Sequence, residues 1–217
     1  MYEEVIKMFY ENRNDVDAEK MSVYMQNKFP FLGIKKPLSS SLQKEFIKQW
    51  KKTKEINWDF IFKLWDLPER EFQYFAIDLI VSLVNELQKN DINNMEKLIT
   101  TKSWWDTVDI LSTKAVGKIC EKYSELKENV IINWSKSENM WLKRSAILFQ
   151  LKFKEKTDTI LLEKIIVESS NTDEFFINKA IGWALREYSK TDREWVREFI
   201  RQNTLKPLTI REGSKYL

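Results

Sequence analysis

The residue types best suited to chemistry occur together in one short stretch, WWDTVD at positions 104–109. Trp105 and Asp109 are four residues apart, so an α-helix would place them one above the other on the same face. Ser103 and Asp106 form an S-x-x-D pattern, which predicts that this helix begins at Ser103. The stretch therefore predicts an aromatic ring and a carboxylate on one surface. Taken by itself, the same pattern also fits a solvated acid beside core tryptophans.

A carboxylate beside indole rings is suited to a positively charged ligand, because the faces of aromatic rings attract cations. A purine alkylated at N3 or N7 carries such a charge. Breaking its bond to the sugar moves positive charge onto the deoxyribose, as in glycoside hydrolysis. A fixed carboxylate would stabilise that charge by about 3 kcal/mol and could orient a water molecule. A cationic leaving group needs little help from an acid, so this chemistry requires no histidine.

The composition excludes several other classes of site and fold. The chain has 217 residues and no histidine, which removes Ser-His-Asp and Cys-His catalysis and histidine-bound zinc. Only four glycines and four prolines interrupt it, which is too few for an all-β fold or for a nucleotide-binding α/β protein. With 43% hydrophobic residues, we expect one folded domain over residues 1–217, with two small domains as the alternative, built from long helices.

The cysteine content and the first residues bear on location. Cys120 is the one cysteine, so no internal disulfide can form and a reducing, intracellular environment is expected. The first residues are acidic where a signal peptide is basic, and no apolar run reaches the ~18 residues of a membrane span. We therefore expect a soluble, cytoplasmic protein that does not bind a membrane. The net charge of +3 and the pI near 8.7 do not identify a nucleic-acid binder by themselves.

Helical periodicity runs through nearly the whole chain. Two prolines and a glycine interrupt it in the aromatic segment 29–37. Asp17, Pro68 and the T-D-R-E pattern at 191–194 mark three expected helix starts. The expected helices span residues 2–11, 17–28, 39–52, 57–67, 68–87, 91–100, 103–111, 113–123, 126–134, 137–152, 158–168, 172–189 and 191–203.

Four of these helices share a local pattern, which predicts an internal repeat. Its anchor positions are Ala76, Asp109, Ala146 and Ala180, separated by 33 to 37 residues. This period is typical of paired-helix repeats, so we expect an all-α fold, a curved solenoid of HEAT-like antiparallel helix pairs with a concave groove. Three anchors are small alanines. A half-buried carboxylate at the same position in the fourth repeat needs a compensating cation or hydrogen-bond donor.

Arg144 and Trp183 are the candidates to complete this site. Arg144 follows Asp109 by 35 residues, close to one repeat, so we expect it on the neighbouring helix at a similar depth. Trp183 lies about one turn beyond the anchor Ala180. Together with Trp105, these residues would place an acid between two aromatic rings and beside a guanidinium. A solvated ion pair at Arg144 and simple core packing of Trp183 stay open as alternatives.

At these same residues the sequence resembles the AlkD-like family of bacterial DNA alkylation repair enzymes, which are DNA glycosylases built from HEAT-like repeats. The resemblance covers nearly the whole chain. The segments that carry it are Tyr24-Met25, FPFLGIK at 29–35, TKSWWDTVD at 101–109, WLKRSAILFQLK at 141–152 and FFINKAIGW at 175–183. One departure is visible at the serines 39–41, where the family often has arginines. A phosphate contact near these serines is therefore in doubt. The departure affects the expected affinity for DNA more than the expected chemistry.

The resemblance implies a monomeric enzyme that removes positively charged 3-alkyladenine and 7-alkylguanine from duplex DNA. It also implies that neither a metal nor a cofactor is needed, and that the protein associates with the nucleoid when it binds DNA. The catalytic residues would be Asp109, Trp105 and Trp183. The DNA-binding residues would be Arg144, Tyr24, Lys152 and Lys179.

Two other functions stay open. A non-catalytic helical-repeat scaffold could bind another protein in its groove, as solenoids commonly do. A binder of DNA structure could share the fold without excising a base. Binding that weakens steeply with salt would favour DNA over a protein partner, because displaced counterions report phosphate contacts. Release of a free base would separate the enzyme from the binder.

Overall fold

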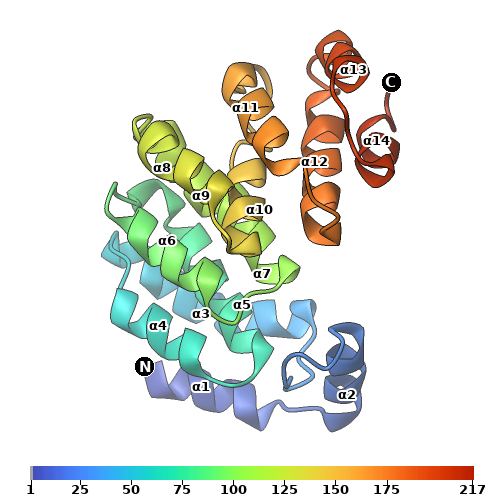
Figure 1. Cartoon of the computed structure of the whole chain (residues 1–217). Helices are drawn as coiled ribbons and strands as arrows, with labels where there is room; N and C mark the ends of the chain where they lie inside the picture. Colours follow the sequence, from blue (N-terminus) through green and yellow to red (C-terminus); the bar gives the residue numbers. More distant parts are fainter. Residues whose placement is uncertain (1) are drawn as a thin grey trace. The chain divides into compact units, whose positions relative to one another are not determined.

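The computed structural model describes residues 2–217 (Figure 1). These residues form helices and no strand, so the all-α prediction is confirmed. Among the described helices, none has the length and apolar character that a membrane span requires. The chain separates into two compact units, Met1–Leu87 and Gln88–Leu217. The single domain expected over residues 1–217 stays a prediction.

The first unit is a group of helices around an aromatic core. Its helices are α1 (Tyr2–Glu11), α2 (Asp15–Tyr24), α3 (Lys36–Thr53), α4 (Trp58–Asp66) and α5 (Arg70–Ser82), followed by a 3-10 turn, Val84–Glu86. Helix α3 packs on α1 and α5, and α4 packs on α5. The ring of Phe46 lies 5.6 Å from that of Phe60 and 5.5 Å from that of Phe75. Burial of these rings, together with the other apolar side chains of this core, stabilises this part of the fold.

The connection between α2 and α3 is anchored by one buried carboxylate. Glu71 accepts hydrogen bonds from the backbone N–H groups of Leu32, Gly33 and Ile34 at 3.0, 2.9 and 3.1 Å. Gly33 has a φ of +83°, and a Cβ atom there would lie 2.0 Å from the carbonyl oxygen of Asn14. The glycine is therefore required both by the backbone conformation and by the close approach of α2.

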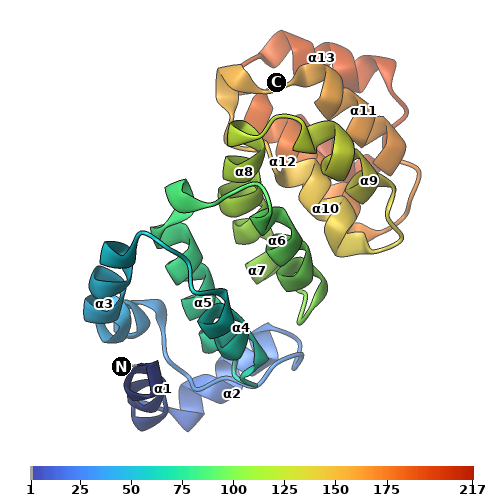
Figure 2. The ribbon, with the colours of Figure 1, turned by 90° about the vertical axis from the view of Figure 1, so that its left-hand side faces the viewer.

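The second unit continues the same architecture. Its helices are α6 (Asp91–Thr100), α7 (Trp105–Ile110), α8 (Gly117–Lys122), α9 (Ile132–Lys136), α10 (Met140–Leu148), α11 (Thr159–Ser169), α12 (Phe175–Tyr188), α13 (Arg193–Gln202) and α14 (Pro207–Gly213). Two π-helical turns, Leu111–Val116 and Lys127–Ile131, and a 3-10 turn, Lys154–Lys156, complete it. Helix α10 packs on α9, α11 and α12, and α12 packs on α13 and α14. Figure 2 shows α9 and α10 as neighbours in this stack.

In the second unit, alternate helices run parallel to each other. Where two of them pack together, the residue numbers of both helices increase in the same direction along the contact. The contacting pairs are Asp109 with Arg144 and Gly117 with Phe149 between α7–α8 and α10, and Asn178 with Thr209 and Gly182 with Glu212 between α12 and α14. The offset between partners is therefore close to one repeat length in every case. A parallel stack of equivalent helices is the arrangement that a helical repeat predicts.

The observed helix boundaries agree closely with the expected ones at α1 and α6 and differ at several caps. Asn14, and not Asp17, caps α2 by accepting from the N–H of Asp17. Asp192 caps α13 by accepting from Trp195, so the cap lies one residue after Thr191. Helix α5 begins at Arg70, two residues after Pro68. Each shift is small, because several capping residues compete within a few positions.

The expected break between residues 111 and 113 is absent. The chain stays helical from Trp105 to Lys122 through the π-helical turn Leu111–Val116. The Ser112 and Thr113 hydroxyls donate to the carbonyl oxygens of Val108 and Asp109 at 2.6 and 2.7 Å. These residues usually favour helix ends, but here they bond back to the preceding turn and the helix continues.

Replacing Gly33 with alanine should lower the free energy of unfolding by at least about 2 kcal/mol, since the new methyl group meets backbone atoms that cannot rotate away. Urea unfolding of the variant measures this loss. Ser40→Ala, at an exposed position of α3, is the control and should change stability by less than about 0.5 kcal/mol. Equal stability of the two variants would contradict the packing described for this connection.

Candidate active site

A two-pronged ion pair lies at the centre of the second unit. The Arg144 Nε atom donates to Asp109 Oδ1 at 2.7 Å, and Nη2 donates to Oδ2 at 2.8 Å. The two side chains are only 6% and 14% exposed. Two parallel charge-assisted hydrogen bonds fix both the position and the plane of the carboxylate. The expected proximity of Asp109 and Arg144 is confirmed.

Helices α10 and α12 hold the guanidinium in place. Asn139 caps α10 by accepting from the N–H groups of Trp141 and Leu142 at 2.9 and 3.3 Å. The remaining Arg144 donor, Nη1, bonds the carbonyl oxygen of Phe176 in the first turn of α12. The Arg144 Cζ atom also lies 5.9 Å from the centre of the Phe176 ring. The side chain of Arg144, which α10 carries, therefore contacts both α7 and α12.

Helix α7 begins on an aromatic cluster. Trp104 precedes it in extended conformation and is 8% exposed. Its ring lies 5.6 Å from that of Trp141 and 5.1 Å from that of Phe176. The predicted S-x-x-D cap is wrong, because the Ser103 hydroxyl donates back to the carbonyl oxygen of Ile99 at the end of α6. Ring packing, and not a side-chain cap, sets where α7 starts.

A pair of buried serine hydroxyls lies next to the ion pair and links α10 to the π-helical turn that follows α7. Ser112 Oγ and Ser145 Oγ are 2.6 Å apart, and both residues are fully buried. Ser145 follows Arg144 directly, and Ser112 lies three residues after Asp109. A hydrogen bond between buried hydroxyls fixes the register of α10 against the π-helical turn. This register places the guanidinium opposite the carboxylate.

The repeat anchors behave as the sequence predicts. Ala76, Ala146 and Ala180 are all fully buried at close helix contacts. Asp109, the fourth predicted anchor, is a charged group with a side chain only 14% exposed and would be an uncompensated charge without its partner. The ion pair with Arg144 supplies the compensation that the sequence requires at this position.

Burial dominates the electrostatics of the acid. Removal from water raises the pKa of Asp109 above its ordinary value, while the hydrogen bonds and charge of Arg144 oppose that rise and the nearby Asp106 adds to it. A carboxyl group with a raised pKa inside a half-open site is typical of functional acids.

The other predicted site residues lie at different distances from this centre. Trp105 opens α7 one turn before Asp109 and is half-buried. Trp183 is half-buried on α12, two turns beyond Phe176. Tyr24 is 72% exposed at the end of α2 in the first unit. That both indole rings flank the carboxylate stays a prediction.

The two predicted DNA-binding lysines each have an acidic partner. Lys152 bonds Glu187 at 2.9 Å, and Lys179 lies 3.2 Å from Glu212. Their roles in binding DNA stay predictions, as does the role of Arg144. Because its guanidinium donates to Asp109 and to a carbonyl oxygen, Arg144 first of all holds the acid in place.

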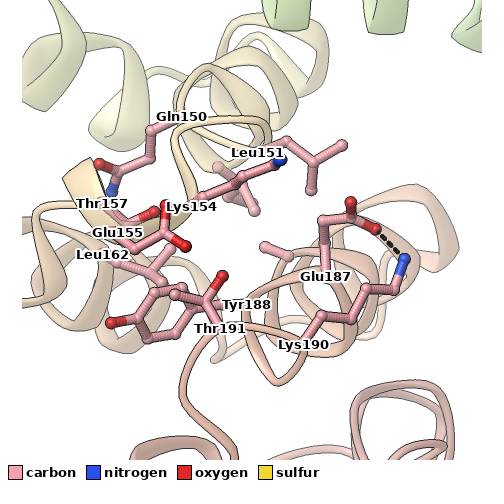
Figure 3. A pocket seen from close by; sticks show the side chains of 12 residues that line it. Gln150, Leu151, Lys154, Glu155, Thr157, Leu162, Glu187, Tyr188, Lys190 and Thr191 are labelled. Carbon is pink, nitrogen blue, oxygen red and sulfur yellow. Dashed lines mark hydrogen bonds and ion pairs between the residues drawn. The ribbon is translucent and has the colours of Figure 1, made fainter.

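A hollow in this unit lies apart from the Asp109 site. It has a volume of about 320 Å³ and lies where α10 and α12 end (Figure 3). Leu151 and Leu162 form part of its apolar lining, and Glu187 pairs with Lys190 at its edge at 2.7 Å. None of its lining residues belongs to the Asp109 site.

The chain matches a known protein family and a solved structure of similar length. The family model described as DNA alkylation repair enzyme matches residues 5–217. A structure described as a predicted DNA alkylation repair enzyme from Enterococcus faecalis is 37% identical, with a TM-score of 0.87, and the match covers 95% of this chain and 97% of that one. We found no match among curated proteins.

A more distant structure agrees in fold. AlkD2 from Streptococcus mutans is 19% identical with a TM-score of 0.59, and the match covers 84% of this chain and 98% of that one. This likeness shows that the chain has the fold of a helical-repeat protein. The repeat architecture expected from the spacing of the anchors is thereby confirmed.

The ion pair predicts a specific pattern of stability. Arg144→Ala leaves a buried carboxylate without its partner and should lower the free energy of unfolding by about 3 kcal/mol at neutral pH. Adding Asp109→Asn should recover part of that loss, because no buried charge is then left unpaired. Urea unfolding of the two single variants and the double variant measures this coupling.

The same unfolding measurements include a control variant and a test of how the loss of stability depends on pH. Lys206→Ala breaks an exposed pair with Asp173 and should cost less than about 1 kcal/mol. The deficit of Arg144→Ala should shrink as the pH falls, because an acid with a raised folded-state pKa destabilises the fold only when it is ionised. Strict additivity of the two substitutions would contradict the coupling.

Proposed function

The chain belongs to the family of DNA alkylation repair enzymes, and from this premise we propose that it is a DNA glycosylase. Its substrates would be purines that carry a positive charge after alkylation at N3 or N7 in duplex DNA. The reaction would be hydrolysis of the bond between the base and the deoxyribose. Asp109 would stabilise the positive charge that develops on the sugar.

The observation that supports this proposal most is the way in which the acid is held. Both Asp109 oxygens are fixed by Arg144, yet the side chain keeps some contact with solvent, at 14% exposed. A carboxylate has about four acceptor positions, and the guanidinium uses one on each oxygen. The remaining positions stay available to a water molecule or a cationic sugar. A fixed charge of this kind needs no reorganisation as the transition state forms.

The proposed step balances as follows. The bond between C1′ and the base nitrogen breaks, and its electron pair moves to the base, which becomes neutral. A water oxygen forms the new bond to C1′, and the water proton passes to Asp109 or to solvent. The products are free base and an abasic deoxyribose with a hydroxyl at C1′. The base leaves as a neutral molecule, so no acid is needed to protonate it.

The aromatic residues fit the charge of the substrate. Trp105 on α7 and Trp183 on α12 are both half-buried, so each presents part of its ring. An indole ring attracts a cationic base by about 0.5–2 kcal/mol. This attraction is lost once the base becomes neutral, which favours release of the product.

Duplex DNA with alkylated bases is the proposed partner. Tyr24, Lys152 and Lys179 are proposed to contact its backbone, and the protein is proposed to act as a monomer in the cytoplasm. A scaffold that binds protein, or a DNA binder without catalysis, remains the alternative that the following experiment addresses.

Asp109→Asn should cut the rate of base release at least tenfold while leaving DNA affinity within about threefold of wild type, because only the charge is removed. Release of free 7-methylguanine from methylated duplex DNA under single-turnover conditions measures the rate. Asp173→Asn, which neutralises an acid that is 93% exposed, is the matched control. No release by the wild-type protein would leave the non-catalytic binder as the better description.

The pH dependence of the same reaction tests the state of the acid. Activity requires the ionised form, so the rate should fall on the acid side through the folded-state pKa of Asp109. Because burial raises that pKa, the midpoint should lie above the pH range in which an exposed aspartate titrates. Replacing Arg144 with glutamine should move the midpoint higher still. An unchanged midpoint in that variant would argue against Asp109 as the titrating group.

A further inference from the structure

One buried carboxylate gathers four cationic side chains between α12 and α14. Glu212 Oε2 lies 2.7 Å from Arg186 Nη1 and 2.8 Å from Lys215 Nζ. Its Oε1 atom lies 3.2 Å from Lys179 Nζ and 4.0 Å from Arg211 Nε. These cations come from two helices and from the chain just after α14. We call these five side chains the Glu212 cluster.

Close packing of two helices places the carboxylate there. A Cβ atom at Gly182 would lie 2.5 Å from the Cβ of Glu212 and 3.2 Å from the carbonyl oxygen of Thr209. No side chain larger than hydrogen fits, so α12 and α14 can lie side by side, as Figure 1 shows. Thr209 also bonds the Asn178 side chain at 3.0 Å. The acid is therefore carried on a rigid contact and not on a mobile tail.

The charges of the cluster do not balance. The hydrogen bond from Lys215 holds the pKa of Glu212 well below its usual range, at about 2, so the acid is ionised at neutral pH. One negative charge faces four positive ones. Glu212 itself is only 7% exposed, whereas Arg211 is 73% and Lys215 47% exposed. The excess positive charge is therefore the part of the cluster that solvent reaches.

The cluster shares a helix face with a predicted site residue. Lys179, Trp183 and Arg186 are spaced at i, i+4 and i+7 on α12, so they lie along one face over about 10 Å. The tryptophan is between the two cations. A strand whose sugar meets Trp183 would thus pass cations on both sides.

We propose that the Glu212 cluster is a phosphate-binding site for the DNA backbone, with Arg211 and Lys215 as its direct contacts. This inference rests on the proposed function, in that DNA is the partner. Glu212 is a positioning residue that brings the four cations together. Lys179 and Arg186 are held closest to the fold, and the two exposed cations reach the phosphodiester oxygens.

A DNA backbone fits this arrangement of cations better than an acidic peptide does. A DNA strand carries regularly spaced, permanent negative charges, and a cluster of guanidinium and ammonium groups neutralises them without reading the sequence. The cluster adds to the affinity for damaged and undamaged DNA alike. It has no contact with the reacting bond and leaves the chemical step unchanged.

The test is DNA binding by the full-length double variant Arg211→Gln, Lys215→Gln. Affinity for an undamaged duplex is measured by fluorescence anisotropy between 50 and 200 mM salt. Two lost phosphate contacts should reduce the slope of log K against log salt by about 1.8, since each contributes roughly 0.9. The same loss is expected with a duplex that contains 7-methylguanine. A slope equal to that of the wild type overturns the proposal.

Two further variants separate charge from structure. Arg201→Gln removes one guanidinium, 71% exposed and paired with Glu198 on α13, outside the cluster, and should leave the slope unchanged. The exchange Arg211→Lys, Lys215→Arg keeps both charges and should bind as wild type does. If the exchanged variant binds as weakly as the glutamine variant, packing and not charge is responsible and the proposal fails.

Base release is measured separately, at enzyme concentrations that saturate the DNA. The glutamine double variant should need a higher protein concentration than the wild type to saturate the DNA, because it binds the backbone more weakly. If the wild-type protein releases no base but the salt slope falls in the variant, the glycosylase proposal fails and the phosphate site stands. If base is released and the slope does not change, the phosphate site fails and the glycosylase proposal stands.

Discussion

A single ion pair between Asp109 and Arg144 determines how the second unit is built. A carboxylate at a position that equivalent helices fill with alanine costs several kcal/mol if it is left alone in the interior. The guanidinium removes that cost with two parallel hydrogen bonds, and it uses its third donor on the first turn of α12. Helices α7, α10 and α12 must therefore meet at one depth. The aromatic cluster of Trp104, Trp141 and Phe176 packs at the same meeting point.

The Asp109–Arg144 pair and the Glu212 cluster are built in the same way with the charges exchanged. In each, a buried charged group holds a more exposed group of opposite charge. At the first, a buried arginine holds an acid that is partly open to solvent. At the second, the buried acid Glu212 holds four cations, of which Arg211 and Lys215 are the most open to solvent. In both places the inner group pairs with partners of opposite charge, and the outer group keeps the solvent contact through which a ligand can reach it. A substrate that combines a cationic base with an anionic backbone has a partner of each kind.

Sequence reasoning identified the fold class and the central pair because both follow from periodicity. A period of 33 to 37 residues indicates which helices are neighbours, so Arg144 could be expected near Asp109 from the stacking of helices, although it lies two positions before the anchor Ala146. Side-chain capping was less predictable, since the Ser103 hydroxyl could either accept from an N–H group at the start of α7 or donate to the end of α6, and it donates to the carbonyl oxygen of Ile99. The carbonyl of Phe176 has no signature in the sequence, because every residue carries that group. Glu212 could not be found either, since its importance depends on Gly182 allowing α14 to approach.

The π-helical turn Leu111–Val116 limits how this protein can change in length. It follows Asp109 by two residues, and beyond it Gly117 still faces the backbone of Phe149 on α10. Inserting or deleting one residue within the turn would rotate the start of the helix by about 100° relative to its end. The carboxylate would then swing away from the guanidinium, although every loop would be intact. Lineages of this protein can therefore lengthen or shorten their connections, but a change of one residue inside this turn would dismantle the ion pair.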